Sequence, residues 1–131
     1  MREILFRGKR TDNGTWAYGY LFCIWERTYL CWGTTNDVPN MKEVIPETVG
    51  QYTGLTDKNG VRIFEGDIVS LVKHDSLIYK VVYVPCRYEL VNSKGVNCFV
   101  LDIYKSENIE VIGNIYDNPE LLGGENNGIN R

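Results

Sequence analysis

Apolar residues recur along this chain in short runs separated by turn residues, a pattern typical of β-strands. The runs span residues 3–9, 15–25, 28–32, 61–64, 68–74, 77–84, 88–91, 96–104 and 109–116. No stretch keeps the apolar period of a helix over a length sufficient for a substantial helix. The sequence therefore predicts a mainly β protein with about nine short strands in antiparallel sheets.

Turn chemistry supports this reading at two positions. Asn13-Gly14 and Asn59-Gly60 each stand between strand-like runs, and Asn-Gly is a strong hairpin signal because both residues accept positive φ. Near the end of the chain, Asn118-Pro119 before "ELL" predicts one short C-terminal helical turn, with Asn118 as its cap. The glycine- and asparagine-rich tail, residues 123–131, is expected to be disordered.

The run from Gly14 to Trp25 is apolar at every second position on both faces. Trp16, Tyr18 and Tyr20 continue into Phe22 and Ile24 along one face, and the intervening residues are also apolar or small. We expect an extended strand covered on both sides by a second layer, a barrel closure or a neighbouring subunit. The alternative is a platform on which single-stranded bases or a sugar stack, and such platforms come with a basic groove.

Charge changes this picture only locally. The 131 residues carry a formal net charge of −3, which argues against the broad basic surface that nucleic-acid binding normally requires. Arg7, Lys9 and Arg10 nevertheless form a basic stretch beside the aromatic row. The candidate interaction surface consists of Arg7, Lys9, Arg10, Trp16, Tyr18 and Tyr20.

The lengths of the apolar segments and the spacing of the cysteines indicate the cellular compartment of the protein. The run after Arg2-Glu3 is too short for a signal peptide, and the longest uncharged run is shorter than the roughly 20 residues of a membrane helix, so we expect a cytoplasmic protein. Four cysteines form no CxxC pair, and His74 is the only histidine, expected to be solvated at a strand end. We therefore expect free thiols, with Cys23 and Cys98 buried, and neither a metal nor a cofactor.

Glu65-Gly66-Asp67 places two acids on either side of a glycine. This arrangement suits a metal site, a shared proton or a tight corner, and we favour a structural corner in which Asp67 binds backbone amides. A catalytic use of Asp57, Glu65 or Asp67 stays open as the alternative. The common signatures of phosphate binding, zinc hydrolysis and serine catalysis are absent, so the sequence predicts a protein that is not an enzyme.

Three blocks closely resemble the YopX family of bacteriophage and prophage proteins. They are "REILFRGKRTDNGTWAYGY", "TVGQYTGLTDKNGVRIFEGDIV" and "IEVIGNIYDNPELL", and the resemblance spans roughly residues 2–122. Thr56, where Lys is common in the family, and Phe64, where Tyr is common, are minor departures. The family's biochemical role is uncharacterised, so the resemblance supplies no catalytic residues.

The resemblance also implies an organisation. Residues 1–122 would form a single YopX-like β domain with two possible sub-modules, an N-terminal β meander over 1–50 and a small Src-homology-3-like barrel over 51–122. Because small barrels host many functions, this fold does not by itself identify the function.

Three functions remain open from the sequence. The first is a non-catalytic interaction module of the host bacterial cytoplasm that forms a homo-oligomer or binds a host or phage protein. The second is nucleic-acid binding through the basic stretch and the aromatic row, and the third is an enzyme using carboxylates. We expect the first function, with no membrane partner.

Overall fold

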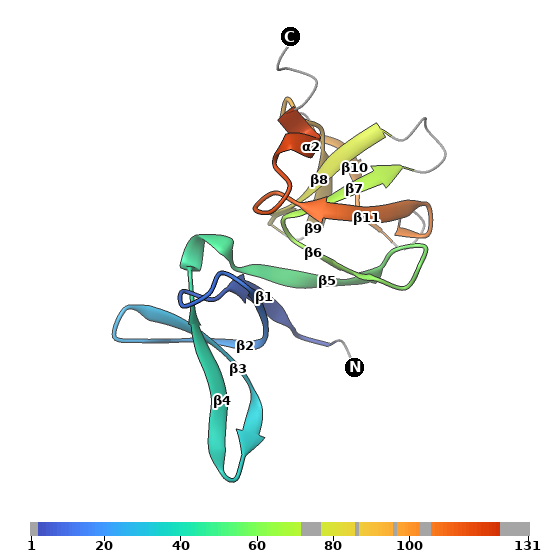
Figure 1. Cartoon of the computed structure of the whole chain (residues 1–131). Helices are drawn as coiled ribbons and strands as arrows, with labels where there is room; N and C mark the ends of the chain where they lie inside the picture. Colours follow the sequence, from blue (N-terminus) through green and yellow to red (C-terminus); the bar gives the residue numbers. More distant parts are fainter. Residues whose placement is uncertain (1–2, 72–76, 86, 96, 103–105, 124–131) are drawn as a thin grey trace. The chain divides into compact units, whose positions relative to one another are not determined.

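The computed structural model describes residues 3–71, 77–85, 87–95, 97–102 and 106–123. The chain divides into two compact units, Met1–Tyr52 and Thr53–Arg131 (Figure 1). Within the described residues, no helix has both the length and the apolar character needed to cross a bilayer. The strands of both units pair antiparallel in two sheets of six and five strands, and one strand, Gly50–Thr56, runs from the first unit into the second.

The first unit is a meander of hydrogen-bonded neighbours. Its elements are β1 (Phe6–Lys9), β2 (Trp16–Ile24), β3 (Arg27–Thr35), β4 (Val38–Val44), the 3₁₀ helix η1 (Pro46–Thr48) and the start of β5 (Gly50–Thr56). The strand order is β4-β3-β2-β1-β5, so β1 lies between its sequence neighbour β2 and the later strand β5. Figure 1 shows β3 and β4 lying side by side as a long hairpin.

The turns of the first unit explain this meander. In the predicted turn at Asn13-Gly14, the Arg10 amide donates to the Thr15 carbonyl at 2.8 Å, and Gly14 has φ 73°. Two further turns were not predicted: Trp25-Glu26 joins β2 to β3, and Asn36-Asp37 joins β3 to β4. Both pairs have φ values of 52° and 67°. Two successive left-handed residues give the type I′ geometry whose twist suits a two-residue hairpin.

The second unit carries a five-stranded sheet of order β10-β9-β8-β7-β11. Its elements are the end of β5, β6 (Arg62–Phe64), β7 (Asp67–Leu71), β8 (Leu77–Val84), β9 (Arg87–Val91), β10 (Asn97–Val100), β11 (Ile109–Asn114) and the helical turn α2 (Glu120–Gly123). The predicted turn at Asn59-Gly60 closes the β5–β6 hairpin. There the Asp57 amide donates to the Val61 carbonyl at 2.8 Å, and Gly60 has φ 82°.

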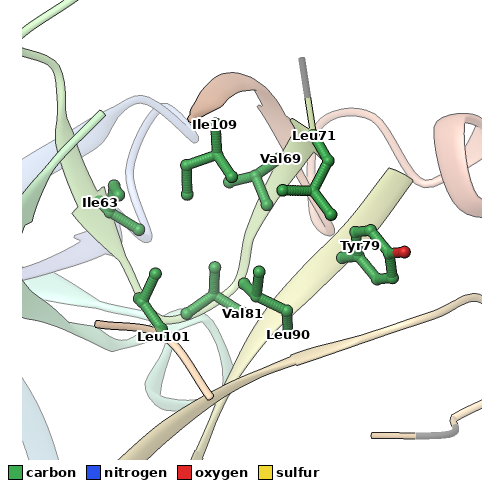
Figure 2. Packing of buried hydrophobic residues seen from close by; sticks show 8 residues of the cluster. All are labelled: Ile63, Val69, Leu71, Tyr79, Val81, Leu90, Leu101 and Ile109. Carbon is green, nitrogen blue, oxygen red and sulfur yellow. The ribbon is translucent and has the colours of Figure 1, made fainter. Parts of the chain in front are cut away.

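Most of the buried apolar surface lies in the second unit. Figure 2 shows side chains of its core cluster pointing toward one another. They belong to Ile63, Val69, Leu71, Tyr79, Val81, Leu90, Leu101 and Ile109. The core of the first unit is much smaller and consists of Ala17, Leu30 and Val44, with Phe6 and Val49 packed against them.

The mainly β architecture and the short C-terminal helical turn are confirmed. The described residues form eleven strands rather than about nine, because β4 and β5 carry too many polar or small residues to stand out as apolar runs. Within these residues the five-stranded sheet is open, since β10 and β11 at its two ends do not pair with each other. The described residues of the second unit therefore form no closed barrel.

Two expectations need correction and several lie outside the described residues. The Asn118 side chain does not cap α2; its Oδ1 accepts from the Asn114 amide at 3.2 Å and so closes the loop that follows β11. Cys23 is exposed and not buried, because it lies near the uncovered end of β2. The predictions for His74, for Cys86 and for residues 124–131 of the tail fall outside the described residues, as does the side chain of Cys98, whereas Gly123, expected in the tail, ends α2.

Candidate interaction surface

The register of β2 fixes which side chains share a face. Arg7 lies opposite Tyr18 and Lys9 lies opposite Trp16 across the β1–β2 pair. Tyr20 lies opposite Cys31 across the β2–β3 pair. Because directly opposed residues lie on the same face of a sheet, the basic residues Arg7 and Lys9 share a face with the aromatic row.

The other face of β2 carries the small core only near β1. Ala17, opposite Gly8 of β1, is buried there, whereas Leu21 and Cys23, further along β2, are exposed, although Leu30 opposite Leu21 on β3 is buried. Close approach of β3 also depends on Gly19, since a Cβ at this position would overlap the Cys31 carbonyl. Toward the turn, the β2 side chains of both faces are therefore largely exposed, whereas their partners on β3 include the polar residues Arg27 and Thr28.

We call residues 16–35, which comprise β2, β3 and the turn between them, the aromatic hairpin. Trp25 at its turn is 91% exposed and Tyr20 is 67% exposed in the single chain. The extended conformation predicted for β2 is confirmed, but the chain's own described residues bury only Ala17 and Gly19 of this strand, with Trp16 and Phe22 half-buried. The large apolar side chains exposed on the hairpin are Tyr18, Tyr20, Leu21, Ile24, Trp25 and Trp32.

Trp25 occupies a strained position. Its φ of 52° lies in the left-handed region, which costs a residue with a Cβ about 1–2 kcal/mol and which Asn or Gly tolerates far better. A tryptophan that is both strained and exposed does not stabilise the isolated hairpin. Strain of this kind is commonly kept at functional positions.

The predicted basic residues are engaged inside the first unit. Arg7 is buried, and its guanidinium lies 4.7 Å from the centre of the Trp16 ring. The Lys9 ammonium lies 5.6 Å from the same ring centre. Both distances are within the range of cation–π attraction, so the two cations already occupy the electron-rich surface that a stacking base would use.

Arg10 is engaged in a different way. Its Nε and Nη2 donate to the two carboxylate oxygens of Asp12 at 3.0 and 2.8 Å, and the Lys42 ammonium lies 3.7 Å from the same carboxylate. The hydrogen bonds from Arg10 lower the pKa of Asp12 below its usual value and raise the pKa of Arg10. A bidentate pair of this kind is directional, but it is exposed and adds little to stability.

A hollow of about 360 Å³ lies at the base of the aromatic hairpin. It is lined by Arg10, Trp16, Ala17, Tyr18 and Trp32. Three of the predicted surface residues therefore meet here: Arg10, Trp16 and Tyr18. Trp32 was missed, although its place at the end of an apolar run next to Gly33 was a visible signal, and Trp25 was assigned to the strand rather than to its turn.

The predicted corner lies in the second unit. Glu65 and Gly66 form the turn between β6 and β7, and Gly66 has φ 92°. Asp67 is buried at the start of β7, and its Oδ2 accepts from the Phe64 amide at 2.7 Å. Gly66 supplies the left-handed dihedral, and Asp67 ties the two ends of the turn together.

Asp57 has a similar role on a larger scale. Its Oδ1 accepts from the amides of Asn59 and Val61 at 2.8 and 2.9 Å, and its Oδ2 accepts from the Val111 amide at 2.9 Å. This buried carboxylate therefore joins the β5–β6 turn to β11. Within the described part of the chain, no three acidic, histidine or cysteine side chains gather as metal ligands.

Comparisons with known proteins agree with the fold and name no activity. A family model described as "YopX protein" matches residues 5–123. The crystal structure of protein EF1440 from Enterococcus faecalis superposes with a TM-score of 0.57 at 22% identity, covering 93% of this chain and 99% of that one. At this identity the likeness shows the fold alone. No curated protein matches the chain.

Proposed function

Because the chain belongs to the YopX family, we propose that it acts as a non-catalytic protein-interaction module that self-associates through the aromatic hairpin. As part of this proposal, the protein is carried by a bacteriophage or prophage and works in the cytoplasm of the bacterial host. The exposed thiol of Cys23 suits such a reducing compartment.

One observation carries the proposal: the apolar side chains of the aromatic hairpin are exposed together. At about 150–250 Å² for each full aromatic side chain, the exposed fractions of Tyr18, Tyr20, Trp25 and Trp32 leave roughly 400–600 Å² of ring surface per chain. A standard protein interface buries about 800 Å² on each partner, so these rings would supply the apolar part of one.

A second copy of the chain is the partner that this surface suits best. The exposed side chains of β2 and of its turn are mostly apolar, as is the core of homodimer interfaces. Any copy of the chain presents the same apolar surface, so an isologous contact covers one face of both hairpins at once. Association also explains why apolar residues are placed where the single chain leaves them in water.

The geometry gives less support to the other two functions. Arg7, Lys9 and Arg10 contact Trp16 or Asp12, so a nucleic acid would have to displace these contacts before the basic stretch became available. The carboxylates of Asp57 and Asp67 accept hydrogen bonds from backbone amides, which favours a role in stabilising turns over a role in proton transfer.

The experiment that tests this function is light scattering during gel filtration, with matched tyrosine variants. Tyr20→Ser removes an exposed ring from the aromatic hairpin, whereas Tyr83→Ser removes a ring of similar exposure, 54%, from β8 in the second unit. We expect the wild type and Tyr83→Ser to elute as oligomers and Tyr20→Ser to shift toward the mass of one chain. A monomeric wild type, or equal loss of mass in both variants, would contradict the proposal.

A further inference from the structure

Trp25 and the hollow lie at opposite ends of the same hairpin. Trp25 projects from the turn between β2 and β3, while Trp16, Ala17 and Tyr18 line the hollow at the start of β2. From Ala17 to Trp25 the chain advances eight residues, roughly 25 Å at the rise of an extended strand. Each copy of the chain therefore carries a projection and a recess at a fixed separation.

The recess suits an indole ring. Its lining residues include Trp16, Tyr18 and Trp32, and indoles pack favourably against other aromatic rings in edge-to-face or offset arrangements. Because Arg7 and Lys9 lie over the Trp16 ring, Tyr18 and Trp32 are the residues against which an entering indole would pack. The hollow of about 360 Å³ is open to solvent, so a ring from another chain can enter it.

Two-fold symmetry joins these features without further adjustment. When two hairpins pack antiparallel about a two-fold axis, the turn of one lies against the base of the other, and the second contact follows by symmetry. The axis then passes near the middle of β2, where Tyr20 is the most exposed residue of the strand. The arrangement covers the surface on which the proposed function depends.

We propose that the protein forms a two-fold dimer in which Trp25 of each copy inserts into the hollow lined by Trp16, Ala17, Tyr18 and Trp32 of the other. The inference rests on the proposed function and specifies its contact. Trp25 is then the anchor of the interface, which gives a reason for an aromatic residue at a turn position where Asn or Gly is less strained. Without a recess that receives it, the exposed Trp25 side chain would have no function that offsets the strain of its turn position.

Position-specific photo-crosslinking of the full chain tests the contact. A photoreactive phenylalanine analogue replaces Trp25, and isotopically labelled and unlabelled chains are mixed before irradiation and peptide mapping. We expect mixed-isotope crosslinks from position 25 to the peptides that contain residues 16–18 or residue 32. Crosslinks confined to other peptides, in a preparation that still forms dimers, would overturn the contact and leave the proposed self-association intact. A monomeric wild type would overturn both.

A substitution series gives an independent readout. Trp25→Asn suits the left-handed turn, so the hairpin is expected to fold at least as well as in the wild type. Because buried tryptophans are frequent interface anchors, we expect its dimer Kd to rise about 30-fold or more. Val38→Asn is the matched control, since Val38 is exposed beside the β3–β4 turn of the same unit. An unchanged Kd for Trp25→Asn, or an equal rise for both variants, would overturn the proposal.

Discussion

The two units use their large apolar side chains in opposite ways. The second unit buries eight of them in one cluster, including the fully buried Ile63, Leu90 and Ile109. The first unit buries Ala17, Leu30, Val44 and Tyr52 and leaves two tryptophans and two tyrosines of the aromatic hairpin exposed. The units are built from the same antiparallel hairpins, so the difference lies in where the apolar residues are placed.

The buried core of the second unit stabilises the fold, whereas the exposed rings of the first unit are available for association. Each buried aliphatic or aromatic side chain stabilises the folded state by about 1.5–3 kcal/mol relative to an exposed one, so the second unit holds most of the stability available to the single chain. The exposed rings of the first unit add nothing comparable until something covers them. We expect substitutions in the second unit to change unfolding and substitutions in the aromatic hairpin to change association.

The largest effect is expected from Leu90→Ala in the second unit. Leu90 is fully buried on β9, so its truncation removes apolar contacts and leaves a cavity, at a cost of about 2–5 kcal/mol in the free energy of unfolding. Urea unfolding measures the loss. Leu77→Ala, at a half-exposed position on the neighbouring strand β8, is the control and should change the midpoint little. Equal losses would mean that the core cluster does not carry the stability.

Asp57→Asn is expected to cost somewhat less, about 1–3 kcal/mol. The amide keeps one acceptor oxygen, but its NH₂ group faces a backbone N–H where the carboxylate had accepted a hydrogen bond. Thermal unfolding should show a lower midpoint, together with faster amide exchange at Val111. Glu65→Gln at the next turn serves as the control. An unchanged midpoint for Asp57→Asn would show that the links from the carboxylate to the β5–β6 turn and β11 are dispensable.

In the first unit, Gly19→Ala is expected to lower both stability and association. The added Cβ would overlap the Cys31 carbonyl, so β3 must move away, at a cost typical of overpacking, about 1–3 kcal/mol. Because this movement bends the aromatic hairpin, we also expect weaker association, measured by sedimentation. Thr34→Ala, exposed on the same strand β3, is the control. If Gly19→Ala lowers stability but leaves association unchanged, association does not depend on the shape of the hairpin.

The smallest effect is expected at the exposed Arg10–Asp12 pair. The folded-state pKa of Asp12 is lowered, chiefly by the hydrogen bonds from Arg10, so its contribution to stability is present above the unfolded pKa and is lost as the pH falls through the folded value. An NMR titration should find the Asp12 pKa below that of an ordinary aspartate and nearer to it in Arg10→Gln. An Asp12 pKa that does not respond to Arg10→Gln would contradict the hydrogen bonding described for the pair.

Local turn chemistry explains what the sequence predicts well. Asn13-Gly14 and Asn59-Gly60 form turns where expected, with Gly14 and Gly60 in the left-handed region that glycine favours; the asparagines before them do not share the positive φ that was expected of both residues. Asn36-Asp37 carries a similar signal in a polar stretch and was overlooked there. Trp25-Glu26 carries none, because neither residue favours a left-handed φ, so the end of β2 was placed one residue too late.

Coverage is the feature that the sequence predicted least well. The apolar alternation of β2 shows that both faces avoid water, but it does not say whether the same chain or another copy covers them. Cys23 illustrates the error, since it was expected to be buried within an apolar run and lies exposed on the hairpin. The hollow also escaped prediction, because Trp16 and Trp32 come together only through the pairing of β2 with β3.

Whether a second copy of the chain covers the aromatic hairpin can be measured by sedimentation equilibrium of the wild-type protein over a wide dilution series, which gives the molar mass without substitution or labelling. We expect twice the mass of one chain at high concentration and a reversible fall toward one chain on dilution. The mass of a single chain at every concentration would show that no second copy covers the hairpin.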